Sequence, residues 1–259
     1  MNTIIERLEP VLERSGTAVQ RANYYFRLVN MEYRRDRYWP DDLSFKHAQQ
    51  CVAASKESGE LEIIGLATFE LGFCHMFRME FDQAESFLKE SLALCERIGD
   101  MEKIVLCNSY LTLTYRRKKA LEAVKDWASR SLAVACEANM SLYQAVALAN
   151  KSWVSFMEAD LEQAEEFARQ AQATFRKTPV YPVLSVYIWP LLAISLHKNQ
   201  LDQAAELAEV LIHPGQHRIP EKLEAELRSS IDLYKGGKWE QSKAGFETAV
   251  QMAMDTGYF

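Results

Sequence analysis

Two histidines, His213 and His217, have the spacing at which a helix can bind a metal ion. Side chains four residues apart lie on one face of a helix, so both imidazoles could reach one zinc ion. Pro214 and Gly215 lie between them, however, and a proline interrupts the helix that this geometry needs. No third ligand is obvious beside the pair. The pattern therefore predicts a loop, and we expect no metal site there.

The other residues that could do covalent or acid–base chemistry do not form the pattern of an active site. His75 and His197 occur singly in segments with helical periodicity. No serine or cysteine stands out with a partner histidine and an acid, as nucleophilic catalysis requires. Carboxylate pairs such as Glu165 and Glu166 fall on the surface of a predicted helix, and no P-loop signature is present. We therefore expect a protein that is not an enzyme and needs no cofactor.

The cysteines do not pair in sequence. None of them belongs to a C-x-x-C motif, and most lie on the apolar stripes of predicted helices. Free cysteine in that setting behaves as a small hydrophobic residue. The cysteines are Cys51, Cys74, Cys95, Cys107 and Cys136. Reduced thiols of this kind are typical of a cytosolic protein.

The most concentrated run of charge is RRKK, at 116–119, which follows Tyr115 at a predicted turn between two helices. Cations suit the C-terminal end of a helix, so a solvated turn is one interpretation. A patch for an acidic partner is the other, because a second basic cluster lies at the equivalent turn of an earlier helix pair. The candidate patch consists of Arg34, Arg35, Arg116, Arg117, Lys118 and Lys119.

The composition is that of a folded, soluble, helical protein. Of the 259 residues, 48% are hydrophobic and 25% are charged, and only 10 are glycine and 7 proline. The net charge of −6 argues against direct binding to nucleic acid, whose phosphates favour a basic face. Residues 1–14 carry charges throughout, unlike a signal peptide, and the sequence has no run of eighteen apolar residues. We therefore expect a cytoplasmic protein that does not bind a membrane.

One stretch, FDQAESFLKESLALC from Phe81, recurs in altered form along the chain. Similar stretches begin at Leu121, Leu161 and Leu201, each 40 residues after the last, and a more distant one begins at Trp239. Apolar residues recur at offsets i, i+3, i+6 and i+7, which form one stripe of an α-helix. An acidic residue follows each start, where it favours the positive end of the helix dipole. We therefore expect helices that begin within a few residues of 82, 122, 162, 202 and 240.

A second periodic segment precedes each of these helices, so each repeat is predicted to be a hairpin of an A helix and a B helix. The turns from A to B are short, and short turns force antiparallel neighbours. We expect an all-α solenoid of about six hairpins in a single domain of residues 1–259. The hairpins span about 18–57, 61–97, 102–137, 142–175, 182–212 and 221–254.

Residues 1–16 form a predicted half-repeat before the first hairpin. This segment is either a cap of the array or the remainder of a repeat in a longer protein. Pro10 lies inside it and should bend or shorten its helix.

The repeats resemble the tetratricopeptide (TPR) family, whose pattern is W-x2-L-G-x2-Y followed by A-x3-F. The L-G pair at 71–72 and Ala84 follow that pattern, with Leu88 in its Phe position, whereas Thr68 and His75 replace its Trp and Tyr. The resemblance implies a TPR-like superhelical solenoid that binds protein or peptide.

The 40-residue period also resembles the C-terminal arms of bacterial signal-transduction ATPases. The run LIHPGQHRIPEKLEAELRSSIDLYKGG from Leu211, and the ending at 255–259, look especially like such arms. That resemblance implies a regulatory or sensor arm and not a catalyst.

In TPR arrays the A helices line the concave side, so the resemblance also implies a set of inward-facing residues. These inner-face residues are Phe69, Phe73, Tyr110, Arg116, Asn150, Trp153, Phe156 and Trp189. The set is mostly apolar, which does not suit the family members that clamp a C-terminal carboxylate. Such a groove either receives a partner, with Trp153 and Trp189 as the best anchors, or is filled by the protein's own tightly wound helices.

Two other functions compete with a protein- or peptide-binding scaffold. One is a receptor that holds a small molecule or a peptide signal in the concave channel. The other is an oligomerisation module that forms a homo-oligomer. The sequence does not identify a partner for any of the three.

Two single residues, Trp127 and Pro190, give predictions about burial and helix geometry. Trp127 lies in a column that is always bulky, so it should be buried between layers. Pro190 lies inside a predicted A helix at 182–197 and has no N–H for the carbonyl of Val186. We expect a kink at 186–189 and a carbonyl that is open to a water, a side chain or a ligand.

Overall fold

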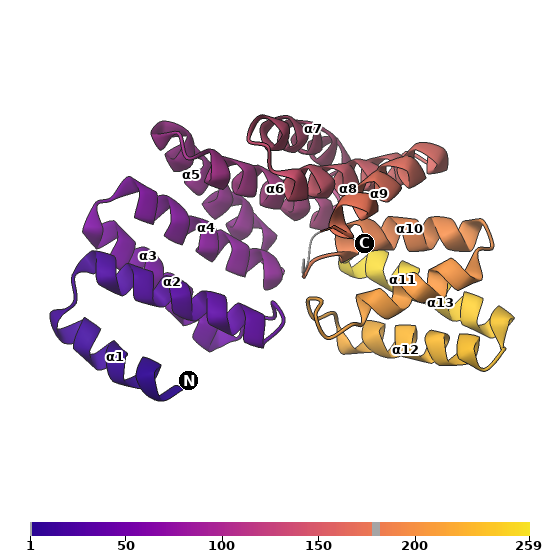
Figure 1. Cartoon of the computed structure of the whole chain (residues 1–259), viewed down its shortest axis with the longest axis horizontal. Helices are drawn as coiled ribbons and strands as arrows, with labels where there is room; N and C mark the ends of the chain where they lie inside the picture. Colours follow the sequence, from indigo (N-terminus) through magenta and orange to yellow (C-terminus); the bar gives the residue numbers. More distant parts are fainter. Residues whose placement is uncertain (1, 178–181) are drawn as a thin grey trace. The chain divides into compact units, whose positions relative to one another are not determined.

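The chain is all-α in the part that the structure describes, as the sequence predicts (Figure 1). The computed structural model describes residues 2–177 and 182–259, and no strand occurs among them. The helices are α1 (Asn2–Ser15), α2 (Ala18–Arg35), α3 (Asp42–Ser58), α4 (Leu61–Phe77), α5 (Phe81–Ile98), α6 (Met101–Arg117), α7 (Leu121–Glu137), α8 (Ser141–Met157), α9 (Leu161–Phe175), α10 (Ser185–His197), α11 (Leu201–Leu211), α12 (Glu221–Lys235) and α13 (Trp239–Thr256).

The helices belong to two compact units. Unit 1 is Met1–Leu111 and unit 2 is Thr112–Phe259, so the boundary falls within α6. In unit 1, α2 packs against α3, α3 against α4 and α4 against α5. In unit 2, consecutive helices from α7 to α13 also pack against each other, and α10 additionally contacts α8 and α13.

The helices that carry the recurring stretch begin where the sequence predicts. Their first residues are Phe81, Leu121, Leu161, Leu201 and Trp239, each one residue before the expected start. The acidic residue that follows each start lies in the first turn of its helix. The carboxylates therefore have the favourable position relative to the helix dipole.

The turns that precede these helices share one backbone conformation. Met79, Lys119, Ala159 and Asn199 lie 40 residues apart, and all have φ between 54° and 64°. Only glycine adopts this left-handed region without strain. In each turn the next amide donates to a carbonyl five residues back, at 2.8–3.0 Å. This closure is that of a Schellman motif, and it ends each preceding helix sharply.

Small residues of the repeat pack at the centre of each helix pair. The small column of the B helices is fully buried, as is the column four residues later. These residues are Ala84, Val124, Ala164 and Ala204, and Leu88, Ala128, Ala168 and Ala208. Short side chains let a neighbouring helix approach closely, so the periodic pattern in the sequence marks the packed face of each helix.

The prediction that Trp127 is buried between layers is wrong, because its ring is only half-buried. Tyr115, in the same helix pair, stacks on the indole with ring centroids 6.0 Å apart. The guanidinium of Arg130 lies 5.0 Å from the indole centroid. Phe87 has the same arrangement, stacked on His75 at 5.3 Å. At Trp127 and Phe87 the bulky column therefore lies at the edge of a helix pair, where an aromatic or basic neighbour covers part of the ring, whereas Leu207 of the same column is buried.

The N-terminal helix α1 continues on both sides of Pro10, so the proline does not shorten it. The helix packs on α2. Thr17 caps α2 through a capping box with Gln20. Leu8 and Val11 of α1 are exposed by 44% and 47%, so α1 has an apolar side that this chain does not cover.

Candidate functional site

The inner-face residues do not line an open groove. Their exposed fractions range from 0% to 8%, except that Phe156 is half-buried. Trp153 and Trp189, expected to be anchors for a partner, are 2% and 0% exposed. Side chains buried this fully cannot present a binding surface, so the prediction of an exposed apolar groove at these residues is wrong.

In unit 1 the inner-face residues form an aromatic cluster. The ring of Phe73 lies 6.1 Å from that of Phe69, 5.0 Å from Tyr110 and 5.2 Å from Tyr33, measured between centroids. Edge-to-face and tilted contacts at these distances add about 0.5–1.5 kcal/mol per pair to the burial of the rings. The cluster is therefore a packed core and not an open cage.

A buried carboxyl, Glu70, belongs to α4, the helix that also carries Phe69 and Phe73. Its side chain is 7% exposed and hydrogen-bonds to Asn30. Burial raises the pKa of Glu70 to about 7, although Asn30 and the positive charge of Lys103 act in the opposite direction. Glu70 can therefore change its charge near neutral pH.

In unit 2 the centre of the inner face is Arg116. Its guanidinium is 3% exposed and donates to the side-chain oxygen of Asn150 at 3.3 Å and to the carbonyl of Val186 at 2.7 Å. It also lies 5.8 Å from the centroid of the Trp153 ring. Burial, and then the neighbouring charge of Arg117, lower the pKa of Arg116 to about 9.

The carbonyl that Arg116 reaches is the one that Pro190 was predicted to free. Proline has no N–H, so the carbonyl of Val186 has no helical donor. The helix α10 nevertheless runs without interruption over Ser185–His197. The Val186 carbonyl therefore accepts from the Arg116 side chain of α6, and pairing with a side chain was one of the outcomes expected from the sequence.

Two aromatic residues at the C-terminal end pack onto the same part of unit 2. The ring of Phe259 lies 4.9 Å from that of Phe156, and Tyr258 stacks on His217 at 6.1 Å. The guanidinium of Arg117 lies 4.8 Å from the centroid of the Tyr258 ring. The sequence did not predict this packing, although an apolar residue after a helix-ending glycine is the usual companion of a Schellman motif. In unit 2 the chain's own end therefore helps to fill the inner face.

The predicted histidine pair lies in two different environments. His213 is exposed, and its Nδ1 accepts a hydrogen bond from the amide of Gly215 at 3.0 Å. His217 is 2% exposed, and its amide donates to the carbonyl of Pro182 at 2.8 Å. The intervening residues form the loop that Pro214 predicts. Among the described residues, no group of three or more His, Cys, Asp or Glu side chains is placed to hold a metal ion.

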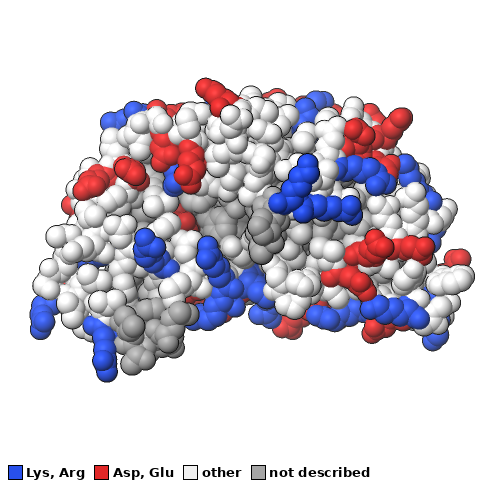
Figure 2. Space-filling model, in the orientation of Figure 1, with Lys and Arg blue, Asp and Glu red and all other residues white. Residues whose placement is uncertain are grey.

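The candidate basic patch contains fewer surface cations than the sequence suggests. In unit 1, Arg34 and Arg35 are exposed, but Arg35 forms a 2.6 Å ion pair with Asp36. In unit 2, Lys118 and Lys119 are exposed. Arg116 belongs to the core and Arg117 is half-buried against Tyr258, so Arg116 is not part of a surface patch, contrary to the prediction. Blue and red side chains both occur over the face in Figure 2.

In several helix pairs within a unit, a polar contact joins the end of an A helix to the first turns of the preceding B helix. In unit 1, Arg78 after α4 pairs with Asp42 of α3 at 3.1 Å. In unit 2, Glu158 after α8 pairs with Lys125 of α7 at 2.6 Å. The B helix thus contributes the acidic partner, Asp42, in the first pair and the basic partner, Lys125, in the second. Opposite charges in a fixed order favour one alignment of neighbouring helices over others.

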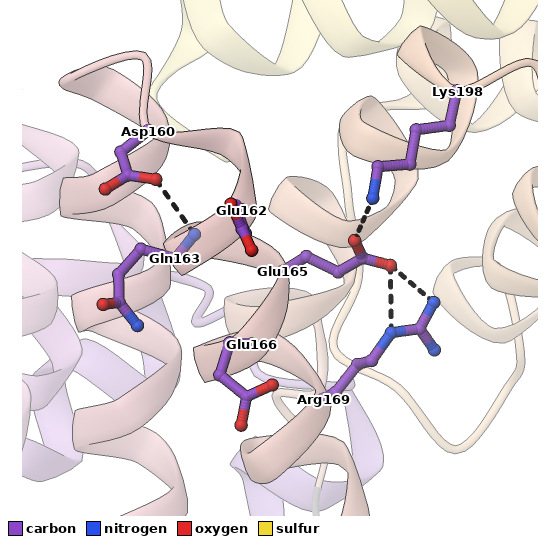
Figure 3. A pocket seen from close by; sticks show the side chains of 7 residues that line it. All are labelled: Asp160, Glu162, Gln163, Glu165, Glu166, Arg169 and Lys198. Carbon is purple, nitrogen blue, oxygen red and sulfur yellow. Dashed lines mark hydrogen bonds and ion pairs between the residues drawn. The ribbon is translucent and has the colours of Figure 1, made fainter.

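The next contact of this kind lines a shallow acidic depression of about 690 Å³ (Figure 3). Glu165 of α9 accepts from Arg169 at 2.6 and 2.9 Å and pairs with Lys198 after α10. The cations of Lys198 and Arg169 lower the pKa of Glu165. Asp160 accepts from the amide of Gln163 at 3.0 Å and caps the helix. These carboxylates already have partners within the protein, so they do not form a binding site by themselves.

A second depression of about 450 Å³ lies at the same place in the next helix pair. It is lined by residues 199–203, Tyr234 and Trp239. The hydroxyl of Tyr234 donates to Asp202 at 2.6 Å, so the contact between helix pairs recurs here without an ion pair. The recurrence indicates that both depressions arise where neighbouring helix pairs stack, rather than from a site for one ligand.

No helix of the described residues is long and apolar enough to cross a membrane. No model of a known protein family matches the sequence, and no curated protein matches it either.

Proposed function

We propose that the chain is a TPR-like helical-repeat module that binds a protein or peptide. The observation that carries this proposal is the left-handed turn residue that recurs at Met79, Lys119, Ala159 and Asn199. Repeated turns on a repeated helix stripe are the mark of a solenoid, whose stacked units serve as extended binding scaffolds. The proposed array comprises six hairpins between residues 18 and 254.

The proposed contact surface is the basic turn of unit 2, because the inner face is filled. Lys118 and Lys119 are exposed, and Arg117 is half-buried beside them. Lys119 reaches the backbone carbonyl of Asp255 at 3.4 Å. Turns on a rigid helical frame often carry binding residues. A cluster of exposed lysines attracts an acidic segment, which is therefore the partner chemistry that we propose.

A non-catalytic binding module of this kind fits the regulatory arm of a larger bacterial signalling protein in the cytoplasm. The resemblance of the repeats to such arms supports that role. In such an arm, binding of the partner would be passed to a neighbouring domain.

The test is selection of peptides from a random displayed library on the full chain. We expect peptides rich in Asp and Glu, and we expect their binding to be lost in the variant K118E/K119E. The matched control is K235E/K238E, which makes the same charge change at exposed lysines of the turn between α12 and α13. Selected peptides without acidic bias, or equal loss in both variants, would contradict the proposed surface.

A further inference from the structure

Two buried cysteines of unit 1 share one hydrogen-bond partner. Cys95 of α5 and Cys107 of α6 are 1% and 0% exposed. The Cys107 thiol donates to Oγ of Ser91 at 3.4 Å, and the same oxygen lies 3.9 Å from Sγ of Cys95. The two thiols also hydrogen-bond to each other. Two sulfur atoms from consecutive helices therefore lie side by side in the core of unit 1.

Ser91 and Gly65 hold this pair in place. The Ser91 side chain is fully buried, and its hydroxyl donates to the carbonyl of Gly65 on α4 at 2.7 Å. Because the hydroxyl proton goes to that carbonyl, the Ser91 oxygen is left to accept from the Cys107 thiol. A Cβ atom at Gly65 would lie only 3.2 Å from Sγ of Cys95, so this sulfur packs directly against α4. Ser91 and Gly65 are therefore positioning residues for the two thiols.

The contact between the thiols makes them chemically different. The hydrogen bond to Cys107 lowers the pKa of Cys95, although burial acts in the opposite direction. The same hydrogen bond, followed by burial, raises the pKa of Cys107. The thiolate, and not the thiol, is the nucleophilic form of cysteine. Cys95 is therefore the better nucleophile of the two.

We propose that Cys95 and Cys107 form a redox site, at which hydrogen peroxide joins the two sulfur atoms in a disulfide. The sulfurs already touch, so little movement is needed to reach the S–S bond length of about 2.05 Å. Peroxide is a molecule of nearly the size of water, so a local opening of unit 1 admits it to the buried pair. The site does not depend on the protein-binding surface at the basic turn, since that surface belongs to unit 2.

The oxidation takes place in two steps. The Cys95 thiolate attacks one oxygen of the peroxide, so that an S–O bond forms and the O–O bond breaks. The hydroxide that leaves takes up the proton that Cys95 released and becomes water. The Cys107 sulfur then attacks the Cys95 sulfur, the S–S bond forms, and the S–O bond breaks. The second hydroxide takes the Cys107 proton, so two thiols are oxidised and one peroxide is reduced to two water molecules.

The test is peptide mapping of the full chain after treatment with hydrogen peroxide. An acid quench and alkylation with N-ethylmaleimide in denaturant fix the state of every thiol before digestion. Trypsin cleaves after Arg97 and Lys103, which separates the peptide of Cys95 from that of Cys107. Only a disulfide keeps the two peptides together. We expect this linked pair in the mass spectrum, and we expect a reductant to release both peptides.

Two other thiols of unit 1 are internal controls. Cys51 and Cys74 are 1% and 0% exposed, so burial protects them equally. Cys51 donates to the carbonyl of Ala22 at 3.4 Å and Cys74 hydrogen-bonds to Tyr33, and neither has a thiol as its partner among the described residues. Burial raises the pKa of Cys51 to about 12 and that of Cys74 to about 11. We expect peroxide to remove at least about fivefold more free thiol at Cys95 and Cys107 than at these two.

Two variants separate the roles of the thiols. Cys107→Ser removes the second nucleophile, so the linked peptides should disappear and dimedone, a reagent for sulfenic acid, should label Cys95. Cys74→Ser makes the same change at a buried cysteine of α4, and the yield of linked peptides should stay within about twofold of the wild type.

The exposed thiol of Cys136 shows that the peroxide has acted. A wild type in which Cys136 is oxidised while Cys95 and Cys107 remain free thiols would overturn the proposal. So would oxidation of Cys51 and Cys74 to the same extent as the pair, because burial and not contact would then set the reactivity. If Cys107→Ser does not fold, the map of the wild type still decides.

Discussion

The guanidinium of Arg116 donates a 2.7 Å hydrogen bond to the carbonyl of Val186, from which Pro190 withholds a helical partner. The two residues are 70 positions apart in sequence and belong to α6 and α10. A defect in one helix is thus compensated by a side chain of another. This contact ties the end of α6 to the centre of unit 2.

The first prediction concerns the coupling between Arg116 and Pro190. Arg116→Met leaves the Val186 carbonyl unpaired, whereas Pro190→Ala provides an N–H at the position that the carbonyl needs. We therefore expect Arg116→Met to be less destabilising in the Pro190→Ala background, by about 1–2 kcal/mol. Denaturant unfolding of the four proteins of the cycle measures this difference.

The control for the cycle is Pro220→Ala. Pro220 is the N-cap of α12. An N–H at this position would not bond to a carbonyl within the helix, so replacing Pro220 does not change the carbonyl to which Arg116 donates. Its coupling to Arg116→Met should be within about 0.5 kcal/mol of zero, as for independent sites. Equal coupling for the two prolines would mean that the hydrogen bond to Val186 does not stabilise the fold.

The second prediction uses one chemical change at two positions. Ala159 has a φ of 63° in the turn after α8. A Cβ in the left-handed region costs about 1–2 kcal/mol, so Ala159→Gly should stabilise unit 2 by about 1 kcal/mol. Ala173→Gly, at an exposed position inside α9, should destabilise it by about the same amount. Changes of equal sign in denaturant unfolding would show that the turn does not hold this conformation in solution.

The third prediction concerns the pH dependence of unit 1. The pKa of Glu70 is about 7 in the folded protein, against 4.5 for an exposed glutamate. Between these values the folded protein binds more protons than the unfolded chain, so stability falls as the pH rises. The loss between pH 4.5 and pH 7 is roughly 3 kcal/mol at 1.36 kcal/mol per pH unit. Glu70→Gln should therefore be more stable than the wild type at pH 8 and similar to it at pH 4.5.

Glu62→Gln is the control for Glu70, because Glu62 is exposed on the same helix. Its free energy of unfolding should follow the wild type at both pH values, because the Glu62 side chain is already exposed to solvent in the folded protein. Amide hydrogen exchange of the intact protein, followed in peptide fragments from unit 1, measures the stability of unit 1 separately from that of unit 2. A parallel pH dependence of Glu70→Gln and the wild type would refute the raised pKa.

The sequence predicted those features that depend on local pattern. The helix starts at Leu121 and Leu161 follow from apolar residues at helical spacing, which mark a buried face wherever the neighbours lie. The vacancy at the Val186 carbonyl follows from the covalent structure of Pro190 alone. Such statements need no knowledge of distant contacts.

The features that the sequence did not predict depend on contacts between distant segments. Which side chain would take the Val186 carbonyl depends on which distant residue the fold brings beside α10, and that residue is Arg116. The inner face was expected to bind a partner or to be filled, and pattern alone could not decide between these outcomes. Trp127 belongs to an always-bulky column, but its burial depends on how far neighbouring side chains extend. Packing geometry, and not composition, settles each of these points.

The last prediction concerns the filling of the inner face of unit 2 by Phe259. Its side chain is 3% exposed, its ring lies 4.9 Å from Phe156, and its amide donates to the carbonyl of Ala253 at 3.1 Å. Removing a buried phenylalanine ring costs about 3–5 kcal/mol in a rigid core and less where the chain can collapse into the space. We expect Phe259→Ala to destabilise unit 2 by about 3 kcal/mol, with faster amide exchange at the ends of α8 and α13.

Thr256→Ala is the control, since Thr256 is exposed and its hydroxyl bonds only to the Met252 carbonyl one turn back. A surface change of this kind should stay within about 0.5 kcal/mol. If Phe259→Ala behaves like Thr256→Ala, the ring does not pack against Phe156 in solution, and the inner face of unit 2 is open to a partner after all.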